Sequence, residues 1–208
     1  MPTLLQFAVK KDEFGNIIKY KGRLVKDGRF AEYGKDYTKT YSPTIPASVL
    51  RMILSIGNEN NLYSGQFDIS GAFLYGKAHK KYYIKPPPLY EIKTPIKPGQ
   101  RVLLEVVHNL YGDPTSGWVW CELFRDVLTK QMGFKECKTC KCLFIRARSE
   151  EQYDMLTLHV DDGMMQTTNE MTFAELIENL AKKTFNRTVF RLTMVKDYNL
   201  TETSFKNY

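Results

Sequence analysis

Two adjacent aspartates end a run of strand-forming residues, and their position needs a chemical explanation. Residues 156–163 read LTLHVDDG, so Asp161 and Asp162 follow an apolar segment and precede a glycine. Two carboxylates about 4 Å apart repel each other by about 1 kcal/mol in water, and several times more where the effective dielectric constant is near 20. An exposed turn makes this repulsion tolerable, whereas a bound Mg²⁺ makes it favourable. Because turns are rich in Asp and Gly, the motif alone leaves both interpretations open.

A third carboxylate, Asp68, lies in the strand-like segment LYSGQFDIS. Strict alternation places Phe67 and Ile69 toward the core and leaves Asp68 on the open face with Ser64 and Gln66. A sheet can bring Asp68 beside Asp161, and three carboxylates at strand ends predict a site for two metal ions and a polyphosphate. In such a site one ion lowers the pKa of an attacking hydroxyl and the other stabilises the leaving oxygen.

The segment MLTLHVDDGMMQTT predicts the hairpin that carries the aspartate pair. Asp-Gly is a strong hairpin signal, so we expect the turn at this dipeptide and both aspartates at its tip. Alternation groups Asp161 with His159 and Thr157, opposite the apolar residues of the strand. We interpret His159 as the partner of a carboxylate or a solvated side chain rather than a metal ligand.

Three helices are predicted to support these strands. The first begins near Pro46, with Ser42 or Thr44 as its cap, and ends near Gly57. The second runs from Asp113 and Pro114 to Gly133. The third begins with a capping box from Thr172 to Glu175. The expected buried stripes are Val49, Met52, Ile53 and Ile56; Trp120, Phe124, Val127 and Leu128; and Phe173, Leu176, Ile177 and Leu180.

The remaining segments complete an α+β pattern. FAVKKDEFGNIIKYKGRLVK predicts a hairpin, and RVLLEVV and CLFIRA predict strands, whereas the proline-rich KPPPLYEIKTPIKPG predicts an extended connection. Strands and helices do not alternate regularly. We therefore expect a single domain over 1–208, with an antiparallel sheet and helices packed on one face.

The N-terminal hairpin presents a row of cations. Lys19, Lys21 and Arg23 have the period-two spacing of one strand face. Such a row either binds a polyanion or protects a solvated edge strand from association.

The composition is that of an ordinary globular protein with moderately basic character. The 208 residues are 43% hydrophobic and 25% charged, with a formal net charge of +7. We find neither an apolar run of about 18 residues nor a signal peptide, and four cysteines fit a reducing compartment. We expect an intracellular location, in a cytoplasmic particle or the nucleus.

The cluster CKTCKC predicts either a zinc site or, more simply, small residues in a loop and at a strand start, since no second ligand pair is present.

Taken in order, four segments resemble the reverse transcriptase of Ty1/copia-type retrotransposons, from about Phe7 to about Thr168. They are KYKGRLVKDGRFAEYGKDYTKTYSPTIPASVLRMILSIGNENNLYSGQFDISGAFLYG, NLYGDPTSGWVWCEL, GFKECKTCKCLFIR and LHVDDG. The resemblance implies a reverse-transcriptase-like fingers and palm fold, with fingers at about 1–60 and 75–115 and palm in the remainder. It also implies DNA synthesis on a template-primer of RNA or DNA from dNTPs, with Mg²⁺ or alternatively Mn²⁺ as cofactor.

The resemblance also implies roles for individual residues. Asp68 matches the first catalytic aspartate, and Asp161 and Asp162 match the catalytic pair, so these three are the implied metal ligands. Phe73 falls where the family has the aromatic residue that rejects a ribose 2′-OH. Lys21 and Arg23 fall in the basic fingers strand that meets the triphosphate.

Several positions depart from the family pattern. His159 replaces a tyrosine or apolar residue, and Asp113, Thr115 and Trp118 stand where leucine, glutamine and arginine are usual. RLVKDGRFAEYG replaces a more usual RLVAKGFSQ-x-x-G, and no YFLGIEI-like strand is recognisable after Thr168. The chain begins at the fingers, without an integrase, and ends before a thumb or RNase H domain, which is the pattern expected of a polyprotein piece or a decayed copy.

Three hypotheses follow. The chain is a metal-dependent nucleotidyltransferase that uses Asp68, Asp161 and Asp162. Alternatively, it is a non-catalytic relic that at most binds nucleic acid through its basic face. In the third hypothesis it is a structural domain whose aspartates are turn residues.

Overall fold

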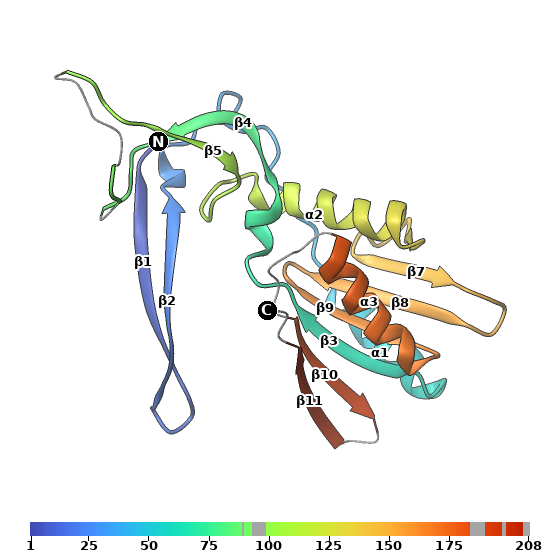
Figure 1. Cartoon of the computed structure of the whole chain (residues 1–208). Helices are drawn as coiled ribbons and strands as arrows, with labels where there is room; N and C mark the ends of the chain where they lie inside the picture. The colour runs from blue at the N-terminus through green and yellow to red at the C-terminus, as the bar shows by residue number, and fades with distance from the viewer. Residues whose placement is uncertain (89, 93–98, 184–189, 197–198, 206–208) are drawn as a thin grey trace. The chain divides into compact units, whose positions relative to one another are not determined.

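The computed structural model describes residues 1–88, 90–92, 99–183, 190–196 and 199–205, with side chains up to residue 180. The chain divides into two units (Figure 1). Residues 1–41 and 73–119 form the first, here called the hairpin unit, and residues 42–72 and 120–208 form the second, the sheet unit. The predicted division into fingers and palm stays a prediction; residues 42–60, expected in the fingers, group with the sheet unit.

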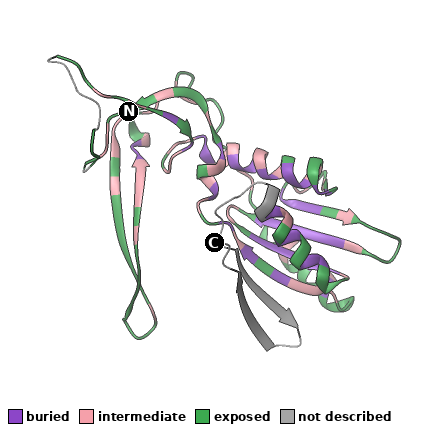
Figure 2. Cartoon of the chain, in the orientation of Figure 1, coloured by how far each residue is buried: buried purple, intermediate pink, exposed green. Residues whose placement is uncertain are grey.

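The hairpin unit contains two separate two-stranded antiparallel sheets. β1 (Thr3–Lys11) pairs with β2 (Ile17–Lys26), as the sequence predicted, and β4 (Lys77–Ile84) pairs with β5 (Leu104–His108). Two 3₁₀ turns, η1 (Gly28–Phe30) and η2 (Ala72–Tyr75), connect to them. Most residues of β1 and β2 are exposed (Figure 2), because no second layer packs on either face of this two-stranded sheet along most of its length.

The sheet unit is built on a seven-stranded antiparallel sheet in the order β11-β10-β3-β9-β8-β7-β6. Its strands are β3 (Tyr63–Asp68), β6 (Lys135–Glu136), β7 (Leu143–Ala147), β8 (Tyr153–His159), β9 (Asp162–Thr167), β10 (Phe190–Lys196) and β11 (Asn199–Phe205). The helices of the sheet unit are α1 (Ala47–Glu59), α3 (Glu170–Lys183) and the part of α2 (Ser116–Asp126) that begins at Trp120. The π-helix η3 (Val127–Gln131) continues α2.

The prediction that the helices pack on one face is wrong. A Cβ on Gly65 of β3 would meet the Phe173 ring of α3, and Phe67 packs on Phe124 of α2, so α2 and α3 cover the same face. A Cβ on Gly57 of α1 would instead meet the Gln166 side chain, which points from the opposite face of β9. Figure 1 shows α1 behind the sheet and α3 in front of it. The small residue Gly57 lets α1 approach the second face.

Burial follows the predicted stripes closely on two of the three helices. Trp120, Phe124, Val127 and Leu128 are fully or almost fully buried, and so are Phe173, Leu176, Ile177 and Leu180. In α1 only Ile53 of the expected stripe is buried, whereas Met52 is 50% exposed. A helix that contacts a sheet on one narrow line buries fewer positions than a core helix.

Candidate active site

The hairpin of β8 and β9 turns through Val160 and Asp161, which differs from the predicted Asp162-Gly163 turn. Asp162 is the first residue of β9, and Gly163 lies inside the strand against the Phe67 ring. With a two-residue turn, His159 pairs with Asp162, so Asp162 and not Asp161 shares a face with His159 and Thr157. The predicted grouping of Asp161 with His159 is therefore wrong.

The structure brings the three predicted aspartates together at the same strand ends. Asp68 is the cross-strand partner of Asp162, and directly opposite residues of antiparallel strands have Cα atoms about 4.5–5.5 Å apart. Asp161 lies next to this pair, since its carbonyl accepts a hydrogen bond of 3.0 Å from the Ile69 N–H. The Ser70 hydroxyl donates to Asp68 Oδ2 at 3.3 Å. Asp68, Asp162 and His159 consequently form a row across β3, β9 and β8.

A cavity of about 550 Å³ opens over this row. Its polar lining comes from Gln66, Asp68, Thr157, His159 and Asp162, and its apolar lining includes Leu50 and Leu54 of α1. Asp161, in the turn, is not among the described residues that line it. The carboxylate row therefore meets a hollow large enough for a substrate group.

The donor set suits a hard divalent cation bound together with a substrate. Over the described residues, no group of three or more His, Cys, Asp or Glu side chains is arranged to hold a metal ion by itself. Mg²⁺ in nucleotide-handling sites is typically held by one or two carboxylates, with waters and phosphates as the other ligands. Asp68 and Asp162 supply such a pair on one face of the sheet.

The predicted nucleotide-binding residues lie in the hairpin unit. Lys19, Lys21 and Arg23 occupy alternate positions of β2 and share one face, as expected. The Arg23 guanidinium lies 5.4 Å from the centre of the Tyr111 ring, and Tyr111 meets Phe73 edge to face at 6.3 Å. Tyr111 thus joins Arg23 to Phe73 in one cluster, which sequence reasoning missed. A backbone bridge between Val25 and Tyr111 places it there.

The residues that depart from the family pattern make ordered contacts. Asp113 forms a buried ion pair with Lys26 at 3.1 Å, with side chains 6% and 3% exposed. Burial by itself raises the pKa of Asp113, but the Thr115 N–H and the Lys26 charge outweigh it and lower that pKa below its ordinary value. The Lys26 ammonium lies 4.4 Å from the Tyr82 ring centre. Burial, and then the negative charge of Asp113, raise the pKa of Tyr82.

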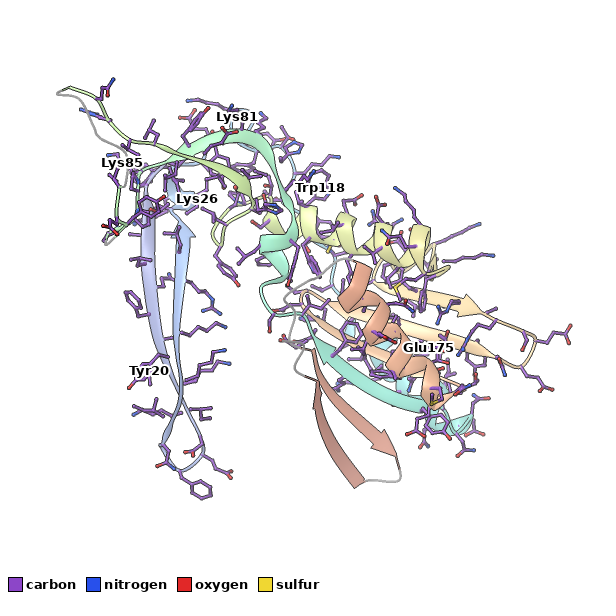
Figure 3. The ribbon with its side chains drawn as sticks, in the orientation of Figure 1. Tyr20, Lys26, Lys81, Lys85, Trp118 and Glu175 are labelled. Carbon is purple, nitrogen blue, oxygen red and sulfur yellow. The ribbon has the colours of Figure 1, made fainter. Side chains whose placement is uncertain are left out.

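Trp118, the third departure in this segment, is also packed. Lys39 Nζ lies 4.7 Å from its ring centre, and His79 meets the ring edge to face at 5.4 Å. Figure 3 labels Trp118 and Lys26. These side chains are integrated parts of the hairpin unit, as expected of residues that contribute to its stability.

The four cysteines are free thiols. Cys142 and Cys121 are buried, and burial raises the pKa of each thiol. In the described part of the chain, no helix is long and apolar enough to cross a membrane.

Asp68 and Asp162 thus form a pair of carboxylates at neighbouring strand ends of an antiparallel sheet, beside a cavity. The family model for reverse transcriptase (RNA-dependent DNA polymerase) matches residues 1–202, and the chain belongs to this family. Its curated relatives identify it as a reverse transcriptase domain of the copia type.

The relatives are retrotransposon polyproteins. The chain is 27% identical over 176 residues to the retrovirus-related Pol polyprotein from transposon TNT 1-94 of Nicotiana tabacum, covering 85% of this chain and 13% of the relative. It is 29% identical over 161 residues to the transposon Ty1-MR1 Gag-Pol polyprotein of Saccharomyces cerevisiae, covering 77% of this chain and 8% of the relative. The chain thus spans a small part of these polyproteins. A structure of apo telomerase from Candida tropicalis aligns over 98% of this chain and 55% of its own, with 12% identity and a TM-score of 0.43.

Proposed function

We propose that this chain carries out metal-dependent nucleotidyl transfer as an RNA-directed DNA polymerase, with Asp68, Asp161 and Asp162 as its catalytic and metal-binding carboxylates. The observation that carries the proposal is the pairing of Asp68 with Asp162, which line a cavity of about 550 Å³ beside the Asp161 turn. Bound Mg²⁺, or Mn²⁺ in its place, would lower the pKa of the attacking primer hydroxyl and stabilise the leaving oxygen.

The contribution of the chain itself is to fix the carboxylates before substrate arrives. Asp68 and Asp162 come from neighbouring central strands, so their spacing is set by the ladder hydrogen bonds. Groups held on rigid elements lose little conformational entropy when they engage a ligand. The electrostatic cost of placing two carboxylates together is then offset when cations bind.

The basic hairpin unit supports the nucleotide part of the proposal. Lys21 and Arg23 would bind the triphosphate through charge-assisted hydrogen bonds. Phe73 would contact the sugar and exclude a ribose 2′-OH, with Tyr111 holding Phe73 and Arg23 in one cluster.

The two faces of the β1–β2 hairpin suit a template strand. One face presents Lys10, Lys19 and Lys21, and the other presents Phe7 and Tyr20, which are 76% and 73% exposed. Tyr20 is labelled on β2 in Figure 3. Cations that follow a backbone, combined with exposed rings on which bases stack, are the usual means of binding single strands. RNA or DNA template-primer is therefore the proposed partner, and other parts of a Pol polyprotein, such as integrase and RNase H, are further proposed partners.

The hypothesis of a non-catalytic relic gains no support from the described contacts. Part of its motivation was the departure of Asp113, Thr115 and Trp118 from the family pattern, and these residues are paired or packed within the hairpin unit. The hypothesis predicts nucleic-acid binding without incorporation.

A primer-extension assay tests the proposal directly. The chain is incubated with a primed RNA or DNA template, dNTPs and Mg²⁺ or Mn²⁺, and Asp68→Asn and Asp162→Asn are compared with Asp126→Asn. Asp126 is an exposed acid of α2 and serves as the matched control. We expect incorporation to fall by at least about 10³-fold in the first two variants and to stay unaltered in the control. Equal rates in Asp68→Asn and the wild type would exclude the proposal.

A further inference from the structure

The turn that carries Asp161 has a strained backbone. Val160 has φ of 62° at the first turn position, where type II′ turns normally place glycine. A β-branched residue in this region is a true outlier, and such conformations persist only where surrounding contacts enforce them. Contacts outside the turn must therefore hold it.

Two hydrogen bonds meet this requirement by holding both carbonyls of the turn. The Trp120 indole Nε1–H of α2 donates to the Val160 carbonyl at 2.6 Å. The Ile69 N–H, immediately after Asp68, donates to the Asp161 carbonyl at 3.0 Å. The Trp120 side chain is fully buried, and its ring packs on Phe124 at 5.3 Å between centroids. The donor thus comes from a ring that the core holds in one orientation.

We propose that Trp120 is a positioning residue for the aspartate pair. Its N–H holds Val160 in the strained conformation and thereby fixes where Asp161 and Asp162 stand beside Asp68. A phenyl ring could fill the same core but could not donate this bond, since only the indole carries an N–H. The part of this inference that concerns metal binding rests on the proposed function; the part that concerns the turn does not.

The first test reports on the hydrogen bonding of the turn and needs no activity assay. Amide hydrogen exchange of Ile69, whose partner is the Asp161 carbonyl, is compared with that of Leu158, whose partner is the Cys142 carbonyl at 3.0 Å. Trp120→Phe should accelerate Ile69 exchange by about 10-fold relative to Leu158. Ile53→Val, a core change in α1 on the opposite face of the sheet that leaves the indole bond and its packing on Phe124 in place, should accelerate both amides equally.

A rescue variant separates positioning from packing. Glycine adopts a positive φ without strain, so Val160→Gly should reduce the dependence of the turn on Trp120. In the background of Val160→Gly, Trp120→Phe should change the ratio of the two exchange rates by less than about 3-fold. The double variant also carries the comparison if Trp120→Phe alone does not fold. An unchanged ratio in Trp120→Phe, or the same change in both backgrounds, would overturn the proposal.

Mn²⁺ titration by calorimetry gives the second readout. Residues that orient metal ligands typically contribute 10–100-fold to metal affinity, so Trp120→Phe should weaken Mn²⁺ binding by about 10-fold and Ile53→Val should not. Equal affinity in Trp120→Phe and the wild type would contradict the positioning role. If the wild type binds no Mn²⁺ and incorporates no nucleotide, the proposed function fails, whereas the exchange ratio still decides the role of Trp120.

Discussion

Gly163 is the residue that lets the carboxylate hairpin pack on the core. A Cβ at this position would lie 2.0 Å from Phe67 Cζ, and the Phe67 ring is itself held against Phe124. The requirement for glycine is therefore steric and does not come from a turn conformation. This explains why the Asp-Gly dipeptide is present although the turn lies two residues earlier in the chain.

Replacing Gly163 should consequently destabilise the sheet unit. Gly163→Ala forces the Phe67 ring to move, and overpacking of this kind costs about 1–3 kcal/mol. Gly22→Ala is the matched control, because a Cβ there would meet the Phe7 ring at an ordinary 3.5 Å. Urea unfolding of both variants should show a loss for Gly163→Ala and a change within about 0.5 kcal/mol for Gly22→Ala. Equal stabilities of the two variants would contradict the steric argument.

The buried Lys26–Asp113 pair predicts a pH dependence in the hairpin unit. The folded-state pKa of Asp113 is lowered from its ordinary 3.8, so the group binds fewer protons in the folded state than in the unfolded state. Its contribution to stability is present above pH 3.8 and is lost as the pH falls through the lowered folded value. Asp113→Asn should therefore destabilise the chain at pH 7 and by less below pH 3.

Denaturant unfolding of the wild type and Asp113→Asn at the two pH values measures this difference. Asp126→Asn, an exposed acid in a surface pair, is the control and should show almost no dependence. A loss for Asp113→Asn that is the same at both pH values would show that the ionised carboxylate is not the stabilising species.

At the scale of elements, a buried carboxylate joins strands β7, β8 and β9 of the seven-stranded sheet. Asp154 of β8 is fully buried and accepts hydrogen bonds of 2.8 Å from Arg146, 2.8 Å from Arg148 and 2.7 Å from the Thr167 hydroxyl. Its partners come from β7, from the loop after β7 and from β9. This network joins three strands at the end of the hairpin that is far from the aspartate turn.

Asp154→Asn should destabilise the sheet unit by roughly 3 kcal/mol, because it leaves two arginines without their buried counter-charge. Thermal unfolding should show a lower midpoint, whereas Asp126→Asn should leave it nearly unaltered. Well below the midpoint temperature of unfolding, Asp154→Asn and the wild type are both folded. Because Asp154 lies far from the aspartate turn, the two proteins should bind Mn²⁺ with the same affinity at such a temperature. A stability equal to that of the wild type would mean that the network contributes no net free energy.

Element types were predictable from the sequence to a considerable degree. Strand-like patterns located β3, β7 and β8, and apolar stripes located α2 and α3, because these elements pack against the core of the sheet unit. The hairpin pattern around the Gly15-Asn16 turn located β2, whose residues are mostly exposed. The convergence of Asp68 with Asp162 was predictable only as a hypothesis, since pairing of β3 with β9 is a long-range contact that no local pattern encodes. The metal-binding and catalytic roles of the three aspartates stay predictions.

The errors concern local details that tertiary contacts decide. Helix α3 begins at Glu170 with Asn169 as its cap, and the Met171 N–H bonds to the Asn169 side chain at 2.9 Å, so the predicted Thr172 capping box is wrong. Pro46 precedes α1 without a side-chain cap, so Ser42 and Thr44 do not cap it. A strand does follow Thr168, namely β10, which pairs with β3, although its sequence lacks the YFLGIEI-like pattern.

At the scale of the whole molecule, positive charge is concentrated in the N-terminal hairpin. Residues 1–26 contain six of the thirty Lys and Arg residues but only two of the twenty-three Asp and Glu residues. Three of these cations, Lys19, Lys21 and Arg23, share one face of β2. A polyanion that lies along this face displaces counterions from itself, so binding must weaken as salt rises.

The last prediction concerns this salt dependence. Fluorescence anisotropy with a labelled single strand, between 50 and 200 mM salt, should give a linear fall of log K with log salt. Lys21→Gln should weaken binding to all sequences alike and reduce the slope by about 1, the contribution of one phosphate contact. Lys130→Gln is the control, because Lys130 is an exposed cation of the sheet unit, outside the cationic face of β2. Identical slopes for Lys21→Gln and Lys130→Gln would place the nucleic acid elsewhere, because a cation that touches a phosphate must release a counterion and one that does not cannot.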